Sequence, residues 1–248
     1  MRTSIFVCCN GFSLNIARSF VAQRQEKNAR IVDYHTLSRL GILALICRCM
    51  FAKELRLPHL GGRVFRLIYA FRRKTVKFID DGLAPVALVR PPYGSEILTF
   101  ENFSEIYERL DANRYEFVTC APWRLQNNGF QFPEGYEYVF VSSAGLCVKQ
   151  FKNDLQNSLY LLHPRKYKNG LKSEFSASLS AMPDMENSLF SALVDGQKVV
   201  MGRSVSTVAL ALAAKDAGQL ENLIVSIDKL DPLYSTYRSI LEEIFPCM

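Results

Sequence analysis

The chain has 248 residues and a formal net charge of +6, and 49% of its residues are hydrophobic against 22% charged. This composition excludes a disordered chain and allows one large domain or two domains of ordinary size. The longest apolar stretch, residues 40–50, is interrupted by Arg48 and is shorter than the ~20 residues of a membrane-spanning helix. The positive charge suits anionic ligands, but no RNA-binding signature or zinc-finger spacing accompanies it, so we expect no nucleic-acid partner.

The first half of the chain alternates apolar strands with amphipathic helices. Residues 5–9 predict a strand, because this apolar run is too short for a signal-peptide core. After a turn at Asn10-Gly11, we expect a helix at 14–23, a strand at 29–34, helical material over 37–55, a strand at 75–79, a helix at 101–112 and a strand at 115–120. Prolines at positions 85, 91 and 92 indicate loop or edge structure before that last helix.

The second half repeats the alternation more regularly. Residues 122–136 are rich in Asn, Gln, Gly and Pro and predict a linker. Beyond them we expect strands at 138–141, 159–162, 199–201 and 223–226, and helices at 144–155, 185–194, 205–217 and 233–245. Such alternation is typical of parallel crossover units. The sequence therefore predicts an α/β protein with two Rossmann-like, doubly wound domains facing a cleft, residues 1–130 and 131–248.

Seven cysteines, an odd number, lack the Cys-x-x-Cys spacing of zinc or redox sites. Free cysteines behave as small buried hydrophobic residues, which fits a reducing compartment. We therefore expect a cytoplasmic protein.

Polar motifs follow three of the predicted strands, where ligands of open α/β sheets bind. The first is Asp80-Asp81-Gly82. Asp before Gly is also a common turn signal, but a carboxylate here could accept a proton from an attacking hydroxyl. Two aspartates could instead hold a divalent ion. The Asp-x-Asp pattern usual in metal-dependent transferases is absent.

The second motif is His163-Pro164. Proline restricts the preceding residue to an extended conformation, which projects the imidazole beyond the strand end. There it could donate a proton to a departing phosphate, or it could be a loop histidine without chemistry. The other two histidines, His35 and His59, lie in turn-like surroundings without paired ligands.

The third motif runs from Gly202 to Thr207 and opens a predicted helix. Free N–H groups and the helix dipole favour phosphate at such a terminus, near the hydroxyls of Ser206 and Thr207. The alternative is that Ser204 or Ser206 serves only as the helix cap.

Asp-Asp-Gly, then His-Pro, then Ser-Thr at a helix start, in that order, resembles the bacterial sialyltransferases and polysialyltransferases. The resemblance covers about residues 75–217 through short motifs. It implies a two-domain glycosyltransferase fold of the GT-B type and an inverting reaction that needs no metal and no cofactor beyond the CMP-sugar donor.

The resemblance also implies roles for individual residues. Asp81 would be the general base, and His163 would contact the phosphate of the CMP-sugar and assist its departure. Ser206 and Thr207 would bind the same phosphate, and Glu186 the ribose. The remaining candidates are neighbours of these residues: Pro164, Gly202 and Ser204 on the donor side, and Asn10, Gly11 and Asp80 on the acceptor side.

The sequence therefore favours transfer of sialic acid from a CMP-sugar to a bacterial surface glycan, capsule or lipooligosaccharide, on an acceptor that could be lipid-linked. A transferase for another CMP-linked acidic sugar such as Kdo, and a non-catalytic nucleotide- or glycan-binding relative, are the alternatives. A dehydrogenase is disfavoured because the Asn10-Gly11 loop lacks the Gly-x-Gly-x-x-Gly fingerprint. The acceptor, the linkage and the oligomeric state stay open.

One basic segment, residues 60–74, begins at Leu60, ends at Lys74 and mixes aromatic side chains with cations. On a helix it could lie on the inner face of the cytoplasmic membrane. The alternative is a packed helix whose arginine stems cover apolar surface.

Overall fold

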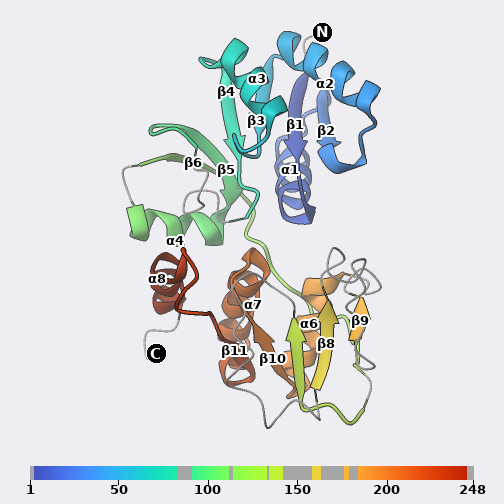
Figure 1. Cartoon of the computed structure of the whole chain (residues 1–248), viewed down its shortest axis with the longest axis vertical. Helices are drawn as coiled ribbons and strands as arrows, with labels where there is room; N and C mark the ends of the chain where they lie inside the picture. Colours follow the sequence, from blue (N-terminus) through green and yellow to red (C-terminus); the bar gives the residue numbers. More distant parts are fainter. Residues whose placement is uncertain are drawn as a thin grey trace. The chain divides into compact units, whose positions relative to one another are not determined.

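The structure is a computed structural model that describes residues 3–82, 91–111, 114–132, 134–141, 158–162, 176–178 and 184–244. The chain divides into two compact units, Met1–Trp123 and Arg124–Met248. The division falls inside the predicted linker, a few residues before the boundary expected at residue 130. Each unit contains one parallel sheet with helices, an α/β arrangement compatible with a Rossmann-like fold (Figure 1).

The sheet of the first unit has six parallel strands in the order β2-β1-β3-β4-β5-β6. Its strands are β1 (Ser4–Cys8), β2 (Ala29–Asp33), β3 (Glu54–Leu57), β4 (Val76–Ile79), β5 (Glu96–Phe100) and β6 (Glu116–Cys120). Parallel pairing brings all their carboxyl ends to one edge. Polar residues that follow β1, β3 and β4 therefore come close together.

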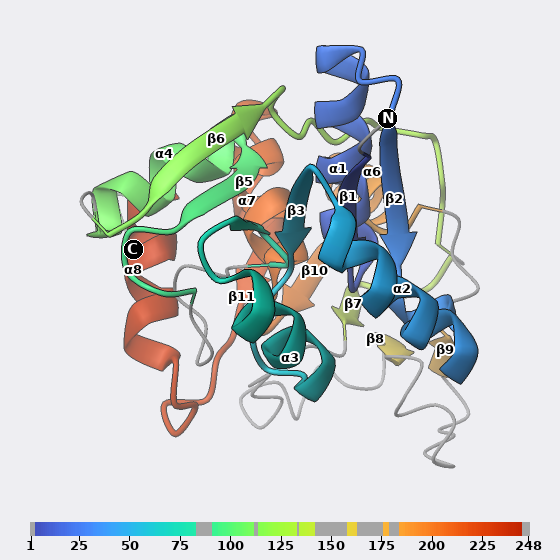
Figure 2. The same ribbon diagram turned by 90° about the horizontal axis from the view of Figure 1, so that it is seen from above.

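Helices cover both faces of this sheet (Figure 2). They are α1 (Gly11–Arg24), α2 (Arg39–Phe51), α3 (Arg63–Arg72) and α4 (Glu101–Asp111), with a short 3₁₀ turn, η1 (Tyr34–Thr36). Successive strand residues point to opposite faces. Accordingly Ile5 and Val7 belong to the core beneath α2 and α3, while the ring of Phe6 contacts Phe20 of α1.

The prediction of helical material over residues 37–55 is wrong at its C-terminal end. Helix α2 stops at Phe51, and β3 begins at Glu54. The strand was missed because it is polar in sequence. Arg56 is almost completely buried, with Glu96 Oε1 at 2.5 Å and Glu54 Oε1 at 2.8 Å from its guanidinium. A buried arginine held by two carboxylates can occupy a central strand that would otherwise need an apolar residue.

The second unit has a five-stranded parallel sheet in the order β11-β10-β7-β8-β9. Its strands are β7 (Tyr138–Val141), β8 (Ser158–Leu162), β9 (Ser176–Ser178), β10 (Lys198–Met201) and β11 (Leu223–Val225). The helices are α6 (Met185–Val194), α7 (Val205–Asp216) and α8 (Tyr234–Ile244), with η6 (Leu220–Asn222) before β11.

The centre of the second unit is made by α7, which packs against α6, α8 and β11. Its alanines allow this close packing, since Ala209, Ala211 and Ala214 are all buried. The predicted strands and helices from residue 185 onward agree with the observed elements to within two residues. The helix expected at 144–155 lies outside the described residues.

No described helix is long and apolar enough to cross a bilayer.

Candidate functional site

The turn after β4 places the two aspartates in different environments. Asp80 is completely buried, and its carboxylate accepts hydrogen bonds from the Gly82 backbone N–H at 3.0 Å, from Thr99 Oγ1 at 2.9 Å and from the Tyr107 hydroxyl at 2.9 Å. These donors tie the turn to β5 and α4. Asp80, expected on the acceptor side, therefore lies in the interior and fixes the shape of the turn.

Asp81 faces the carboxyl edge of the sheet. Its side chain is 18% exposed, and burial together with the neighbouring charge of Asp80 raises its pKa to about 8. The described residues give its carboxylate no arginine or lysine partner within ion-pair distance. A carboxyl group with a pKa near neutrality is suited to take up and release protons at physiological pH.

His59 lies beside Asp81, a neighbour that the sequence analysis did not anticipate. Its Nε2 lies 3.7 Å from Asp81 Oδ2, and its Nδ1 accepts a hydrogen bond from the Gly61 backbone N–H at 2.9 Å. That bond leaves the proton of the neutral imidazole on Nε2, facing Asp81. Burial, and then the charge of His35, lowers the pKa of His59. The imidazole is therefore neutral when Asp81 ionises.

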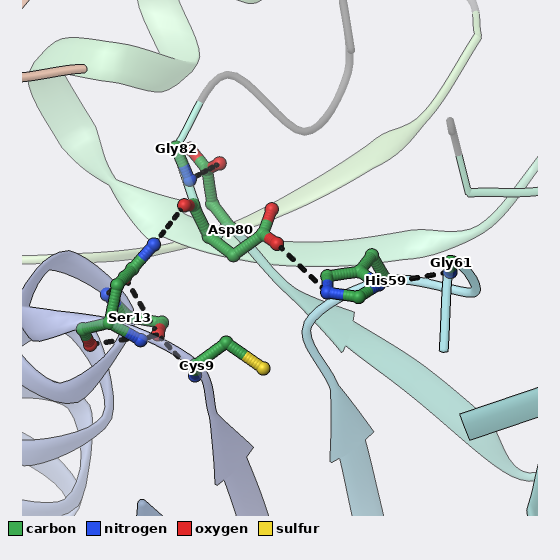
Figure 3. A network of polar contacts seen from close by, with 8 residues as sticks. Cys9, Ser13, His59, Gly61, Asp80 and Gly82 are labelled. Carbon is green, nitrogen blue, oxygen red and sulfur yellow. Dashed lines mark hydrogen bonds and ion pairs between the residues drawn. The ribbon is translucent and has the colours of Figure 1, made fainter. Parts of the chain in front are cut away.

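Asn10 joins the end of β1 to the same turn. Its Oδ1 caps α1 by accepting from the Ser13 backbone N–H at 2.9 Å, and its Nδ2 donates to the carbonyl of Asp81. Figure 3 shows Cys9 and Ser13 beside this contact, with the aspartate turn and His59 across from them. Gly11 begins α1 and has open space where a Cβ would stand. The predicted grouping of Asn10, Gly11 and the aspartates is thus observed within the first unit.

The turn after β10 is held by hydroxyl groups. Ser204 caps α7 by accepting from the Thr207 backbone N–H at 3.1 Å, and Thr207 Oγ1 donates to the Gly202 carbonyl at 2.8 Å. Thr207 is completely buried, so its hydroxyl is committed to the turn. The Tyr237 hydroxyl from α8 donates to the Ser204 carbonyl at 2.7 Å and so ties this turn to α8.

Ser206 makes a different contact. Its hydroxyl donates to Glu186 Oε1 at 2.8 Å, which connects the first turn of α7 to the first turn of α6. The two residues are 20 positions apart in sequence, and the sequence analysis had assigned them separately to phosphate and ribose. They share one place beside the first N–H groups of α7, which have no partners within the helix.

Arg203 lies beside the start of α7, but its guanidinium group forms an ion pair with Asp231. Its Nε lies 3.2 Å from Asp231 Oδ1, and its Nη2 lies 3.4 Å from Oδ2. The pair fixes the segment before α8, and the dipole of α7 adds partial positive charge at the same helix start.

No protein-family model matches the chain, and no curated protein matches it. His163 and Pro164 lie outside the described residues. Within the described part of the chain, no cluster of three or more His, Cys, Asp or Glu side chains is arranged to hold a metal ion. The described residues thus include a carboxyl group with a pKa near neutrality in the first unit. In the second unit they include a helix N-terminus of the kind that binds anions.

Proposed function

We propose that this protein is an inverting, metal-independent glycosyltransferase of the GT-B type that transfers sialic acid from a CMP-sugar to a bacterial surface glycan. The observation that carries the proposal is the position of Asp81, a partly buried carboxyl group just after β4 that lies 3.7 Å from His59 Nε2, has its backbone carbonyl bound by Asn10, and has its pKa raised to about 8. Groups perturbed in this way concentrate at catalytic sites.

The first unit supplies the acceptor chemistry in this proposal. Asp81 takes the proton of an acceptor hydroxyl, and the oxygen attacks the anomeric carbon of the donor sugar. His59 faces the Asp81 carboxylate with its Nε2–H at 3.7 Å, where its dipole favours the ionised carboxylate without a direct hydrogen bond. Asn10 fixes the backbone of Asp81 by donating to its carbonyl, so the base is held by the fold before the acceptor arrives.

The second unit supplies the donor chemistry. As the new bond forms, the bond between sugar and phosphate breaks, and CMP leaves with the electron pair. The N–H groups at the start of α7 stabilise the phosphate charge that develops, and the Ser206 hydroxyl joins them by turning its single proton from Glu186 to the phosphate. Glu186, which then no longer accepts from Ser206, is available to the ribose hydroxyls. His163 assists departure of the phosphate, with Pro164 fixing its backbone.

The same parts would serve CMP-Kdo, which is the alternative donor. Both sugars leave the same CMP group, so the sites described above would act on either. A non-catalytic nucleotide-binding relative would use the second unit alone. It would not need a carboxyl group with a raised pKa in the first unit.

CMP release from CMP-sialic acid, measured with a panel of bacterial surface glycans as acceptors, tests the proposal. Turnover should increase with pH up to about pH 8, because Asp81 acts in its ionised form. Asp81→Asn should reduce turnover by roughly a thousandfold while CMP still binds. The matched control is Asp216→Asn, an exposed acid at the end of α7, which should leave turnover unchanged.

CMP binding without turnover in the wild type, with either donor sugar, would favour the non-catalytic alternative. Full activity in Asp81→Asn would refute the assignment of the base.

A further inference from the structure

Helices α2 and α3 contact each other on one face of the first unit's sheet (Figure 2). Both helices carry large apolar side chains that are exposed. On α2, the exposed residues Leu40, Leu43, Cys47 and Phe51 follow the spacing of a single helical face. Phe51 is 81% exposed, although a phenylalanine normally lies in the core. The opposite side of the helix, with Leu45 and Cys49, already packs on the sheet. The outer stripe is therefore a second apolar face.

Helix α3 continues this surface with a mixture of apolar and basic side chains. Leu67 and Phe71 are 45% and 67% exposed. Exposed cations stand near them: Arg63 is one turn before Leu67, Arg66 adjoins Leu67, and Lys74 follows the end of the helix. Its inner face, with Phe65 and Ile68, is buried against the sheet. We call the exposed residues of these two helices the α2/α3 face.

Positive charge is concentrated in the same part of the chain. Residues 37–75 contain nine Lys and Arg and one acid, a formal charge of +8 against +6 for the whole chain. The single acid, Glu54, is engaged with the buried Arg56. Neither α2 nor α3 contains an acidic residue. An apolar surface on two helices that carry cations and no acid attracts an anionic partner.

A cavity of about 810 Å³ opens at the C-terminal end of α2, next to Phe51. Basic residues line it from several elements, namely Arg30, Arg48, Lys53 and Arg72, and no acid is among its lining residues. Arg72 is held there because it donates to the carbonyls of Met50 at 2.6 Å and Ala52 at 3.0 Å. The positive surface thus extends from the helix faces into a hollow large enough for a phosphate headgroup.

We propose that the α2/α3 face docks on an anionic lipid bilayer, with Leu40, Leu43, Phe51 and Phe71 entering the interface and the surrounding cations contacting lipid phosphates. Apolar burial and attraction to anionic headgroups combine on such surfaces. A second copy of this chain is disfavoured as the occupant, because pairing the face with itself would bring cations against cations. The proposal does not depend on the transferase assignment.

Vesicle sedimentation of the full chain tests this directly. The protein should bind vesicles of phosphatidylcholine mixed with phosphatidylglycerol, and should not bind phosphatidylcholine alone. The double variant Arg63→Glu/Arg66→Glu should weaken binding by roughly twentyfold or more. Phe51→Ser/Phe71→Ser should also weaken it, since two exposed rings no longer enter the interface. High salt should reduce binding in the wild type.

Matched controls come from the second unit. Leu230, which is 89% exposed, and Lys215, which is exposed on α7, provide Leu230→Ser and Lys215→Glu. Both should bind vesicles as the wild type does. Hydrogen exchange of the wild type provides a measurement that needs no variant. Amide exchange in residues 39–74 should be slower with anionic vesicles than without them.

Failure to bind anionic vesicles would overturn the proposal, as would an equal loss in the control variants. A dimer in sedimentation equilibrium that Phe51→Ser/Phe71→Ser dissociates, without any vesicle binding, would assign the face to a second copy instead. Neither result would bear on CMP release, so the two proposals fail separately.

Discussion

The turn after β4 in the first unit and the turn after β10 in the second are each held by hydrogen bonds of a buried polar side chain. In the first turn this side chain is a carboxylate, and in the second it is a hydroxyl. In each, one residue is buried and fully engaged in holding the turn, Asp80 in the first and Thr207 in the second. The adjacent residue, Asp81 or Ser206, makes fewer contacts and lies beside a partner from another element, His59 or Glu186. The comparison teaches that neighbouring polar residues of one motif divide into a building residue, whose polar atoms are used within the turn, and an available residue, which is paired with one side chain from another element and which the proposal above assigns to ligands.

The largest expected effect is at the building residue of the first turn. Asp80→Ala would leave the Thr99 and Tyr107 hydroxyls and the Gly82 N–H without their buried acceptor, and should cost about 3 kcal/mol of unfolding free energy. Urea denaturation measures this. Asp80→Asn, which keeps the size and one acceptor, should cost less. A loss below about 1 kcal/mol in Asp80→Ala would show that the turn does not depend on this carboxylate.

Substitution of Asp81, the available residue of this turn, should increase the unfolding free energy, whereas substitution of Asp80 decreases it. Its pKa is about 8 in the folded protein against an ordinary value of 3.8, so folding disfavours its ionised form. Stability from this group is complete below about pH 4 and is lost as pH increases towards 8. Asp81→Asn should therefore be more stable than the wild type by on the order of 2 kcal/mol at pH 8, and by little at pH 4. Thermal unfolding at the two pH values decides this, and a difference that does not depend on pH would contradict it.

In the second turn the building residue is Thr207. Thr207→Val keeps the shape but removes the hydroxyl that donates to the Gly202 carbonyl, and should destabilise the protein by about 1–2 kcal/mol. Thr207→Ser retains the hydroxyl and serves as the control in the same denaturant series. If valine were tolerated without loss, the division between building and available residues would not extend to the second unit.

The smallest stability effect is expected at Ser206. Its hydroxyl donates to Glu186, which is only half-buried and can be solvated after the change, so Ser206→Ala should cost less than about 1 kcal/mol. CMP affinity in the same variant should decrease by roughly tenfold, because a donor to the phosphate is lost. A large loss of stability with unchanged affinity would make Ser206 a second building residue.

Most of the fold was predictable because its signals are local. From residue 185 onward, the apolar residues follow helical and strand periodicity without interruption. The structure confirms the predicted α/β arrangement with two parallel sheets. Strand β3 was missed because Arg56 looks polar in sequence, and its burial depends on Glu96, which is 40 residues away. Strand β5, residues 96–100, was also missed among the proline-interrupted residues.

The candidate site was predictable only in part, for the same reason. The ends of β4 and β10 were assigned correctly, so Asp81 and Ser206 could be selected from sequence. His59 follows β3, and without that strand nothing placed its imidazole near Asp81, although β3 and β4 are paired neighbours. The buried roles of Asp80 and Thr207 depend on Tyr107 and on the geometry of the turn, which sequence spacing does not encode.

Calorimetric titration with CMP, with UMP, ADP and GDP as controls, tests the central claim most directly, because it requires no knowledge of the acceptor. The account predicts selective binding of CMP to the wild type, weakened in Ser206→Ala and in His163→Ala and unchanged in Lys215→Glu. Equal binding of all four nucleotides, or no binding of CMP, would contradict it.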